Sequence, residues 1–279
     1  MLFALRPKHL IKNSLVLAPA LLPGVLSLNG ILKSMYVFLL FSLLTAGVYL
    51  INDIFDYKLD IQHPFKKSRP LASGIITRSY AVSIAVIYVT SAIVFSYLVS
   101  GSKVFILFCI YLIFNIAYSL FIKVIPYLEM FFVGIGFPIR VLIGFTVSDV
   151  EVNKSYLTIS LLLIFYLALS LITSKRIGEL VLHGAKVRPV LRYYSARSLN
   201  LWLYFIFSLY MLTCVPWLIT KGGISGFLTT VTTILVLQRI YSLGKKALLE
   251  RPDTVITDIY FLLMSGLLGF SLLSLYYIS

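Results

Sequence analysis

Residues 35–55 read MYVFLLFSLLTAGVYLINDIF, and this stretch decides what kind of fold the chain can adopt. No charged side chain occurs in it before Asp53. A helix needs about 20 mainly apolar residues to cross a bilayer. The stretch therefore predicts a membrane span whose last turn carries an acidic residue.

The rest of the chain repeats this apolar pattern. Of its 279 residues, 60% are hydrophobic and 12% are charged, whereas a soluble domain carries about 25% charged residues. This composition excludes a single soluble globular domain, and the aromatic share of 15% excludes a disordered chain. The hydropathy pattern predicts an all-α polytopic membrane protein with nine transmembrane helices, at residues 14–32, 35–55, 79–100, 104–122, 126–147, 156–174, 199–219, 224–243 and 255–277.

The basic residues predict the orientation in the membrane. If the N-terminus is cytoplasmic, the outer segments carry only Lys33, Lys103, Lys154 and Lys221, and almost every other Lys and Arg lies inside. This positive-inside bias predicts a multi-pass protein of the cytoplasmic (inner) membrane with the N-terminus and the long loops on the cytoplasmic side. It also accounts for the net charge of +14 without a nucleic-acid partner. We expect no cleaved signal peptide, because the first apolar run is long and lacks a small-residue cleavage site.

The acidic residues cluster at the inner end of the second predicted span. The chain has only ten Asp and Glu, and three of them are Asp53, Asp56 and Asp60. On a helix these three carboxylates lie within about 60° of one face. Carboxylates near lipid are costly, and oxygen ligands are what Mg²⁺ accepts. We predict that the three aspartates are catalytic and, with Asn52, bind Mg²⁺; the alternative is a helix end with solvated acids.

Basic residues follow the acids directly. Lys66, Lys67 and Arg69 suit a polyphosphate whose charge the metal does not fully cancel; the alternative is contact with anionic lipid. Lys12 and Asn13 lie at the inner end of the first span, where Lys12 either binds a phosphate or anchors the topology. Two cysteines, Cys109 and Cys214, lie in apolar runs and are expected to be buried small hydrophobes.

One basic residue, Arg140, falls inside a predicted span, where such residues usually face a cavity. Glu129 lies on the same helix face, about 16 Å away along the axis. A stripe that lines a cavity is therefore favoured over two charges that face lipid.

The string from Asn52 to Asp60, followed by Lys66, Arg69, Pro70 and Gly74, resembles the first signature of the UbiA superfamily of intramembrane transferases. The resemblance covers nearly the whole chain. It implies a single UbiA-like transmembrane domain over residues 1–279, with nine helices around a central cavity that opens to the cytoplasm. Ordinary members move an isoprenoid from its diphosphate to an acceptor, and they carry a second Asp pair between the sixth and seventh spans. Here that loop has one acid, Glu179.

The later loop is instead similar to the decaprenyl-phosphate phosphoribosyltransferase branch of the superfamily, through Lys175-Arg176-Ile177-Gly178-Glu179-Leu180. The segments around Arg6-Pro7, Tyr118-Ser119, Arg140 and Arg188-Pro189 also resemble that branch. The resemblance implies that 5-phosphoribosyl 1-diphosphate (PRPP) and a polyprenyl phosphate react with Mg²⁺ to give polyprenyl-phosphoryl 5-phosphoribose and pyrophosphate. It also suggests a homo-oligomer such as a trimer. The expected substrate-binding residues are Lys12, Asn13, Asn52, Lys66, Arg69, Tyr118, Lys123, Glu129, Arg140, Lys175, Arg176, Glu179 and Arg192.

Other functions remain as alternatives. The nearest is an ordinary UbiA prenyltransferase, which the missing second Asp pair argues against. A transporter would place charges along a path through the membrane, but the outer half of this chain has few. A scaffold or assembly protein would not need three acidic residues on one helix face. Lys175, Arg176 and Glu179 could also form a plain ion pair at a helix end.

Overall fold

The fold is described by a computed structural model over residues 11–21, 27–62, 66–148, 154–186, 188–221, 223–246, 258, 260 and 263. All regular structure in these residues is helical, which confirms the predicted fold class. The chain divides into two compact units. Met1–Phe132 and Gly136–Glu151 form one, and Val133–Ile135 and Val152–Ser279 form the other. The single domain predicted for residues 1–279 stays a prediction.

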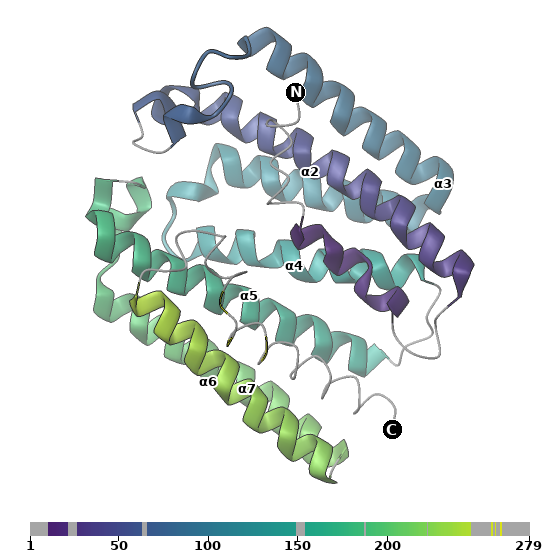
Figure 1. Cartoon of the computed structure of the whole chain (residues 1–279), viewed down its shortest axis with the longest axis vertical. Helices are drawn as coiled ribbons and strands as arrows, with labels where there is room; N and C mark the ends of the chain where they lie inside the picture. The colour runs from purple at the N-terminus through teal and green to yellow at the C-terminus, as the bar shows by residue number, and fades with distance from the viewer. Residues whose placement is uncertain are drawn as a thin grey trace. The chain divides into compact units, whose positions relative to one another are not determined.

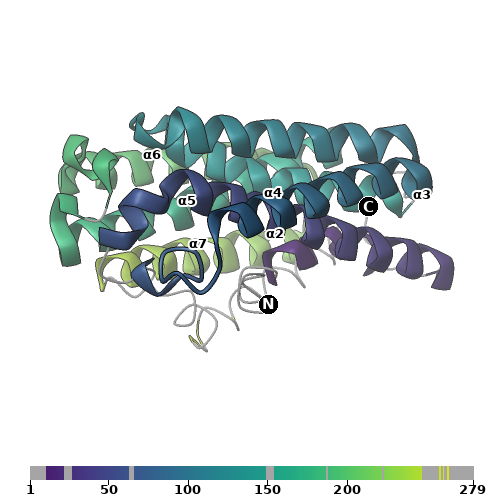
Figure 2. The same cartoon turned by 90° about the horizontal axis from the view of Figure 1, so that it is seen from above.

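The first unit is built on three long helices, α2 (Leu28–Gln62), α3 (Arg78–Leu120) and α4 (Leu128–Val147). Short 3-10 helices accompany them: η2 (Ile11–Val16), η3 (Ala18–Leu21), η4 (Lys66–Ser68) and η5 (Ile122–Val124). Helices α2 and α3 lie side by side in both views (Figures 1 and 2). The loop between them and the start of η5 therefore meet the end of α2, where the acids lie.

Helix α3 contains two predicted spans, because the chain reverses direction within it. At Gly101 the backbone has φ 77° and ψ −177°, which is not helical. Before this point, Ile84 packs near Leu50 and Val89 lies against Gly47, so this arm runs antiparallel to α2. After it, Phe108 contacts Phe41 and Ser119 contacts Asn52, so the second arm runs parallel to α2. Both arms thus pack on α2, as Figure 1 shows.

The second unit contains α5 (Lys154–His183), α6 (Ala196–Lys221) and α7 (Gly223–Lys245), with η6 (Gly184–Lys186) and η7 (Pro189–Tyr193) between α5 and α6. Part of its core gathers Leu163, Tyr210, Cys214 and Leu237 from the three helices. Cys214 is buried, as predicted. The prediction was wrong for Cys109, which is only half-buried on α3.

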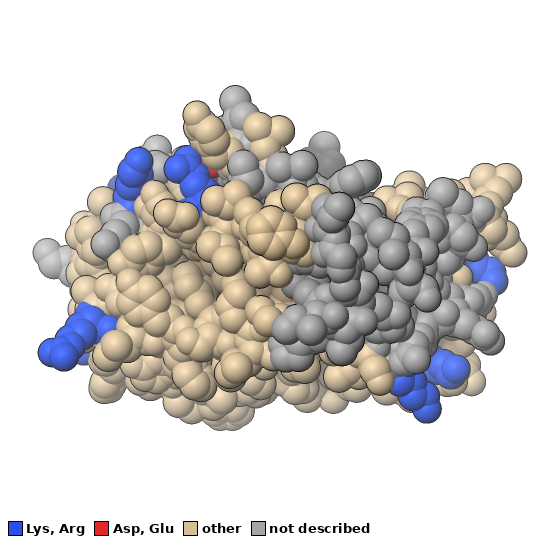
Figure 3. Space-filling view, turned by 90° about the horizontal axis from the view of Figure 1, so that it is seen from below, with Lys and Arg blue, Asp and Glu red and all other residues tan. Residues whose placement is uncertain are grey.

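Six described helices, α2 to α7, have segments long and apolar enough to cross a membrane, so the protein is membrane-embedded. Most of the described surface in Figure 3 carries no charged side chain, and Lys and Arg lie in small separate groups. The structure differs from the predicted first span, 14–32. Its described residues form two 3-10 helices up to Leu21, and α2 already begins at Leu28. Residues 22–26 and most of the predicted last span lie outside the described residues, so the count of nine stays a prediction.

Candidate active site

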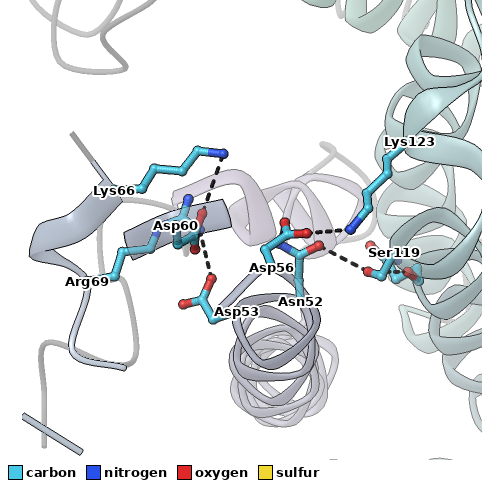
Figure 4. Close-up of polar contacts among 9 residues, drawn as sticks. Asn52, Asp53, Asp56, Asp60, Lys66, Arg69, Ser119 and Lys123 are labelled. Atoms are coloured by element: carbon cyan, nitrogen blue, oxygen red, sulfur yellow. Dashed lines mark hydrogen bonds and ion pairs between the residues drawn. The ribbon is translucent and has the colours of Figure 1, made fainter. Parts of the chain in front are cut away.

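The last turns of α2 carry Asn52, Asp53, Asp56 and Asp60. The C-terminal end of a helix has a partial negative charge, so carboxylates there need cations nearby. Helix α2 has no basic residue in its own last turn. The cations come from other segments of the first unit, as Figure 4 shows.

Asp53 and Asp60 share one guanidinium. Nη1 of Arg69 lies 2.9 Å from Oδ1 of Asp53 and 2.6 Å from Oδ2 of Asp60. Nζ of Lys66 lies 3.8 Å from Oδ1 of Asp60. Both carboxylates are buried, with exposed fractions of 6% for Asp53 and 2% for Asp60. The loop that follows α2 therefore neutralises the two least accessible acids of the cluster.

Asp56 points to a different set of partners. It forms an ion pair with Lys123 of η5, and Nδ2 of Asn52 lies 3.2 Å from Asp56 Oδ2. The hydroxyl of Ser119 on α3 donates to Oδ1 of Asn52 at 3.1 Å. Asn52 and Asp56 are thus oriented from the end of α3, whereas Asp53 and Asp60 are oriented from the loop (Figure 4).

The predicted metal ligands are of the right chemical type for Mg²⁺, since all four offer oxygens at the end of one helix. One oxygen from Asp53 and one from Asp60 converge on a single nitrogen of Arg69, which marks a point that a cation can occupy between them. Among the described residues, no three acids, histidines or cysteines already form a group that could hold a metal. By their chemistry the carboxylates fit a Mg²⁺ site, which one or two carboxylates can hold with help from substrate phosphate.

Arg140 lies in a buried polar network at the side of α4 and is 4% exposed. Its Nε donates to Oδ1 of Asn13 at 3.0 Å, and its Nη2 donates to the Tyr111 hydroxyl at 3.0 Å. Nδ2 of Asn13 in turn contacts the hydroxyls of Ser42 and Thr45, at 3.2 and 2.9 Å. These contacts tie η2, α2, α3 and α4 together.

Three aromatic rings surround the same guanidinium. The Arg140 Cζ lies 5.2 Å from the ring centre of Phe41, 5.1 Å from that of Tyr111 and 5.8 Å from that of Phe137. Ring faces attract cations, so the rings stabilise the positive charge of Arg140 although they carry no negative charge themselves. The structure thus agrees with the expectation that Arg140 is turned away from lipid.

Lys12 lies near this cluster, with Nζ 5.7 Å from the ring centre of Phe137. Its side chain is accessible, yet protein atoms stand on most sides of it. This desolvation, followed by the charge of Arg140, lowers the pKa of Lys12 to about 8. An anion placed beside Lys12 would oppose both effects.

The second unit holds a different ionic cluster. Nη1 of Arg176 donates to Oε2 of Glu179 at 2.8 Å, and the exposed fraction of both residues is 3%. Nε of Arg188, just before η7, lies 3.1 Å from the same oxygen. Two guanidiniums therefore share one buried carboxylate, where ordinary relatives are expected to have a second acid pair.

Four further predicted site residues lie on α3, α5, α4 and η7. Tyr118 is half-buried on α3, and Lys175 is half-buried beside Arg176 on α5. Glu129 is fully buried in the first turn of α4, and Arg192 is exposed in η7. Other residues that contact the predicted ones had no predicted site role: Ser42, Thr45, Tyr111, Ser119, Phe41, Phe137 and Arg188. Six of these residues are uncharged, and Arg188 lies nine residues after Glu179. No charge pattern or helical spacing therefore linked them to the predicted site residues.

The fold matches solved structures over nearly its whole length. A structure described for digeranylgeranylglyceryl phosphate synthase aligns with a TM-score of 0.71 and 19% identity, and the match covers 98% of this chain and 96% of that one. A UbiA homologue from Archaeoglobus fulgidus bound to DMAPP and Mg²⁺ aligns with a TM-score of 0.67 and 15% identity, and the match covers 98% of each chain. At these identities the likeness shows the fold alone.

Proteins related by sequence share a higher identity with this chain than these solved structures do. A decaprenyl-phosphate phosphoribosyltransferase of Corynebacterium glutamicum is 30% identical over 207 residues, which make up 72% of this chain and 61% of that protein. The protein of the same name from Mycobacterium tuberculosis is 28% identical over 244 residues, which make up 83% of this chain and 78% of the relative. The chain thus spans less than two thirds of the Corynebacterium relative. The pattern of the UbiA prenyltransferase family matches residues 16–265. The chain therefore belongs to the UbiA prenyltransferase family.

Proposed function

We propose that this protein is a Mg²⁺-dependent polyprenyl-phosphate phosphoribosyltransferase. Its donor is PRPP, its acceptor is a polyprenyl phosphate, and its products are polyprenyl-phosphoryl 5-phosphoribose and pyrophosphate. The names of the relatives from Corynebacterium and Mycobacterium support this reaction. The membrane-embedded helices suit a lipid acceptor, and the basic loops suit a highly charged soluble donor.

The observation that carries the proposal is the ionic cluster of Arg176, Glu179 and Arg188. Ordinary members of the superfamily, which act on prenyl diphosphates, are expected to carry two acid pairs that can each hold a metal. Here two guanidiniums surround a single carboxylate, so the cluster keeps a net positive charge. Planar guanidiniums match phosphate oxygens directly. This favours a reaction in which a metal is needed for only one phosphate group.

Asp53, Asp56 and Asp60, with Asn52, are the residues that would hold Mg²⁺. When bound, the ion supplies neutralisation of the pyrophosphate leaving group. Arg69 and Lys66 lie beside these acids and can bind the remaining donor phosphate oxygens. Carboxylate and phosphate charge nearby would stabilise positive charge that develops on the ribosyl ring.

The acceptor phosphate is already an anion, so it needs positioning more than deprotonation. Lys12 carries an accessible ammonium, and Asn13 and Arg140 hold the segment around it in place. We propose that Lys12, held by this segment, positions either a phosphate of the donor or the phosphate of the acceptor. Attack at C1 from the face opposite pyrophosphate then inverts that carbon. Tyr118, Lys123, Glu129, Lys175 and Arg192 are proposed as further contacts to the substrates.

We further propose that the active site faces the cytoplasm from the inner membrane and that the protein works as a homo-oligomer. The alternative activity is transfer of an isoprenoid from its diphosphate to an aromatic or lipid acceptor. It is favoured by the family itself and by the fold likeness to a homologue bound to DMAPP.

The test is a reaction with purified protein, PRPP, a polyprenyl phosphate and Mg²⁺, read by product mass. Asp53→Asn and Asp56→Asn should reduce turnover by more than the ten- to hundredfold that loss of an outer partner costs. Asp258→Asn is the matched control, because Asp258 pairs with Arg239 of α7. Prenylated product from a prenyl diphosphate and an aromatic acid, without consumption of PRPP, would establish the alternative instead.

A further inference from the structure

Two buried carboxylates need a cation whether or not a metal is bound. Asp53 and Asp60 are 6% and 2% exposed, and a buried carboxylate without a partner is costly. In this structure one nitrogen of Arg69 contacts an oxygen of each carboxylate, and Lys66 adds a second cation beside Asp60. The guanidinium thus stands between the same oxygens that a divalent ion would use.

Arg69 and a metal ion cannot hold these oxygens in the same way at the same time. Mg²⁺ takes its oxygen ligands at about 2.0–2.1 Å, whereas a guanidinium holds carboxylates at about 2.7–2.9 Å. Both are cations, so they also repel one another at this range. If the Arg69 guanidinium or the metal ion occupies the point between Asp53 and Asp60, it must therefore weaken the binding of the other cation there.

The loop allows the side chain to leave while its backbone stays. The amide of Arg69 donates to the carbonyl of Lys66 at 2.9 Å, and the amide of Ser73 donates to the carbonyl of Arg69 at 2.8 Å. The amide of Ile76 donates to the carbonyl of Pro70 at 3.1 Å. The Arg69 side chain is 22% exposed, so it already reaches solvent. Rotation of its flexible stem can free the guanidinium without unfolding the loop.

We propose that Arg69 is an exchangeable internal counter-ion: it neutralises Asp53 and Asp60 in the metal-free protein, is displaced from them by the divalent ion, and then binds the donor's phosphate oxygens. The last step rests on the proposed function, whereas the exchange itself does not. In this scheme Arg69 is a counter-ion before the divalent ion binds and a substrate-binding residue afterwards. Lys123 pairs with Asp56 from another segment, so the exchange is proposed for the Asp53–Asp60 pair.

The test measures metal binding without either substrate. Full-length protein is purified, treated with EDTA and titrated with Mn²⁺ alone, with the free ion read by electron paramagnetic resonance. Arg69→Gln should bind Mn²⁺ about tenfold more tightly than the wild type, because a competing cation is removed. Arg78→Gln, which removes an exposed charge at the first residue of α3, should bind as the wild type does. Equal or weaker binding by Arg69→Gln would overturn the exchange.

A second measurement uses the wild type, so it does not depend on the folding of a variant. An arginine-specific dicarbonyl reagent is applied with and without Mn²⁺, and modified peptides are quantified by mass spectrometry. Mn²⁺ should raise the modification rate of Arg69 at least about threefold, because a guanidinium held by two carboxylates reacts slowly, and should leave Arg78 unchanged. An unchanged or slower rate at Arg69 overturns the exchange while leaving the proposed reaction intact. No Mn²⁺ binding by any variant overturns both.

Discussion

At the scale of single residues, Arg140 is a buried cation held by several partners. Its described partners are neutral: the side chains of Asn13 and Tyr111, the carbonyl of Gly136 and three aromatic rings. Arg140→Met keeps an unbranched stem but removes the guanidinium, which leaves Asn13 Oδ1 and the Tyr111 hydroxyl without this donor. The free energy of unfolding should fall by about 1–3 kcal/mol. Thermal unfolding in detergent measures this.

A matched variant separates the hydrogen bonds from the charge. Arg140→Lys retains the charge but cannot reach the acceptors with a planar fork, so it should also lower the melting temperature. If Arg140→Met instead proves as stable as the wild type, the cost of burying the charge equals the gain from its hydrogen bonds.

Lys12 gives a prediction on pH. Its pKa in the folded protein is about 8, below the ordinary 10.5, so the folded state releases this proton more readily than the unfolded state. Below pH 8 the folded state carries the full cost of the charge; as pH rises from 8 to 10.5, that cost is relieved. Lys12→Met should therefore stabilise the protein at pH 7, with a gain that shrinks towards pH 10. Melting temperatures at several pH values test this, and a gain independent of pH would contradict it.

The sequence predicts the acids of the candidate site and names Lys66, Arg69 and Lys123 as substrate-binding residues, but it does not predict which acid each cation pairs with. The spacing of Asp53, Asp56 and Asp60 predicts neighbours on one helix, because helical geometry is local. Their cations lie 9, 16 and 67 residues away. Those distances are set by the loop after α2 and by the reversal within α3, which no local spacing encodes. This is why one predicted face appears in the structure as two differently paired groups.

At the scale of elements, the reversal at Gly101 is what brings Ser119 and Lys123 to the end of α2. The φ of 77° with ψ of −177° lies in a region that is essentially restricted to glycine. A Cβ at this position would meet nothing within 4 Å, so the cost of Gly101→Ala comes from the backbone alone. We expect a loss of about 1–3 kcal/mol of stability, together with weaker Mn²⁺ binding at the acids.

Ser102→Ala is the control, because Ser102 is exposed at the next position. It should leave the melting temperature and Mn²⁺ affinity unchanged. If Gly101→Ala behaves like this control, the reversal does not need the conformation found at residue 101.

Hydropathy predicted most elements to within several residues, including the break between the two arms of α3. It failed at residues 14–21, where an apolar window suggested a transmembrane helix and the structure has 3-10 turns. Pro19 lacks a backbone N–H and interrupts an α-helix there. Asn13 also uses its side chain to contact Ser42 and Thr45 rather than to cap a helix. The mean hydropathy over a window of residues reflects neither the missing N–H of Pro19 nor the side-chain contacts of Asn13.

At the scale of the whole molecule, the charge bias and the structure make one joint prediction about orientation. Because α3 reverses at Gly101, we expect its two ends to lie on one side of the membrane and residues 101–103 on the other. The positive-inside rule places the loop at 66–74 in the cytoplasm and Lys103 outside. Ser73 and Ser102 are both exposed, so a cysteine at either position would be reachable from its own side.

Single cysteines at Ser73 or Ser102, in a background with Cys109 and Cys214 replaced by alanine, therefore report the orientation. In intact cells, a membrane-impermeant maleimide should label Ser102→Cys and spare Ser73→Cys; after permeabilisation it should label both. Labelling of Ser73→Cys in intact cells would place the acids of α2 on the outer side. Since PRPP is a soluble anion made in the cytoplasm, that result would remove the donor from reach of the site, and the proposed reaction would fail with it.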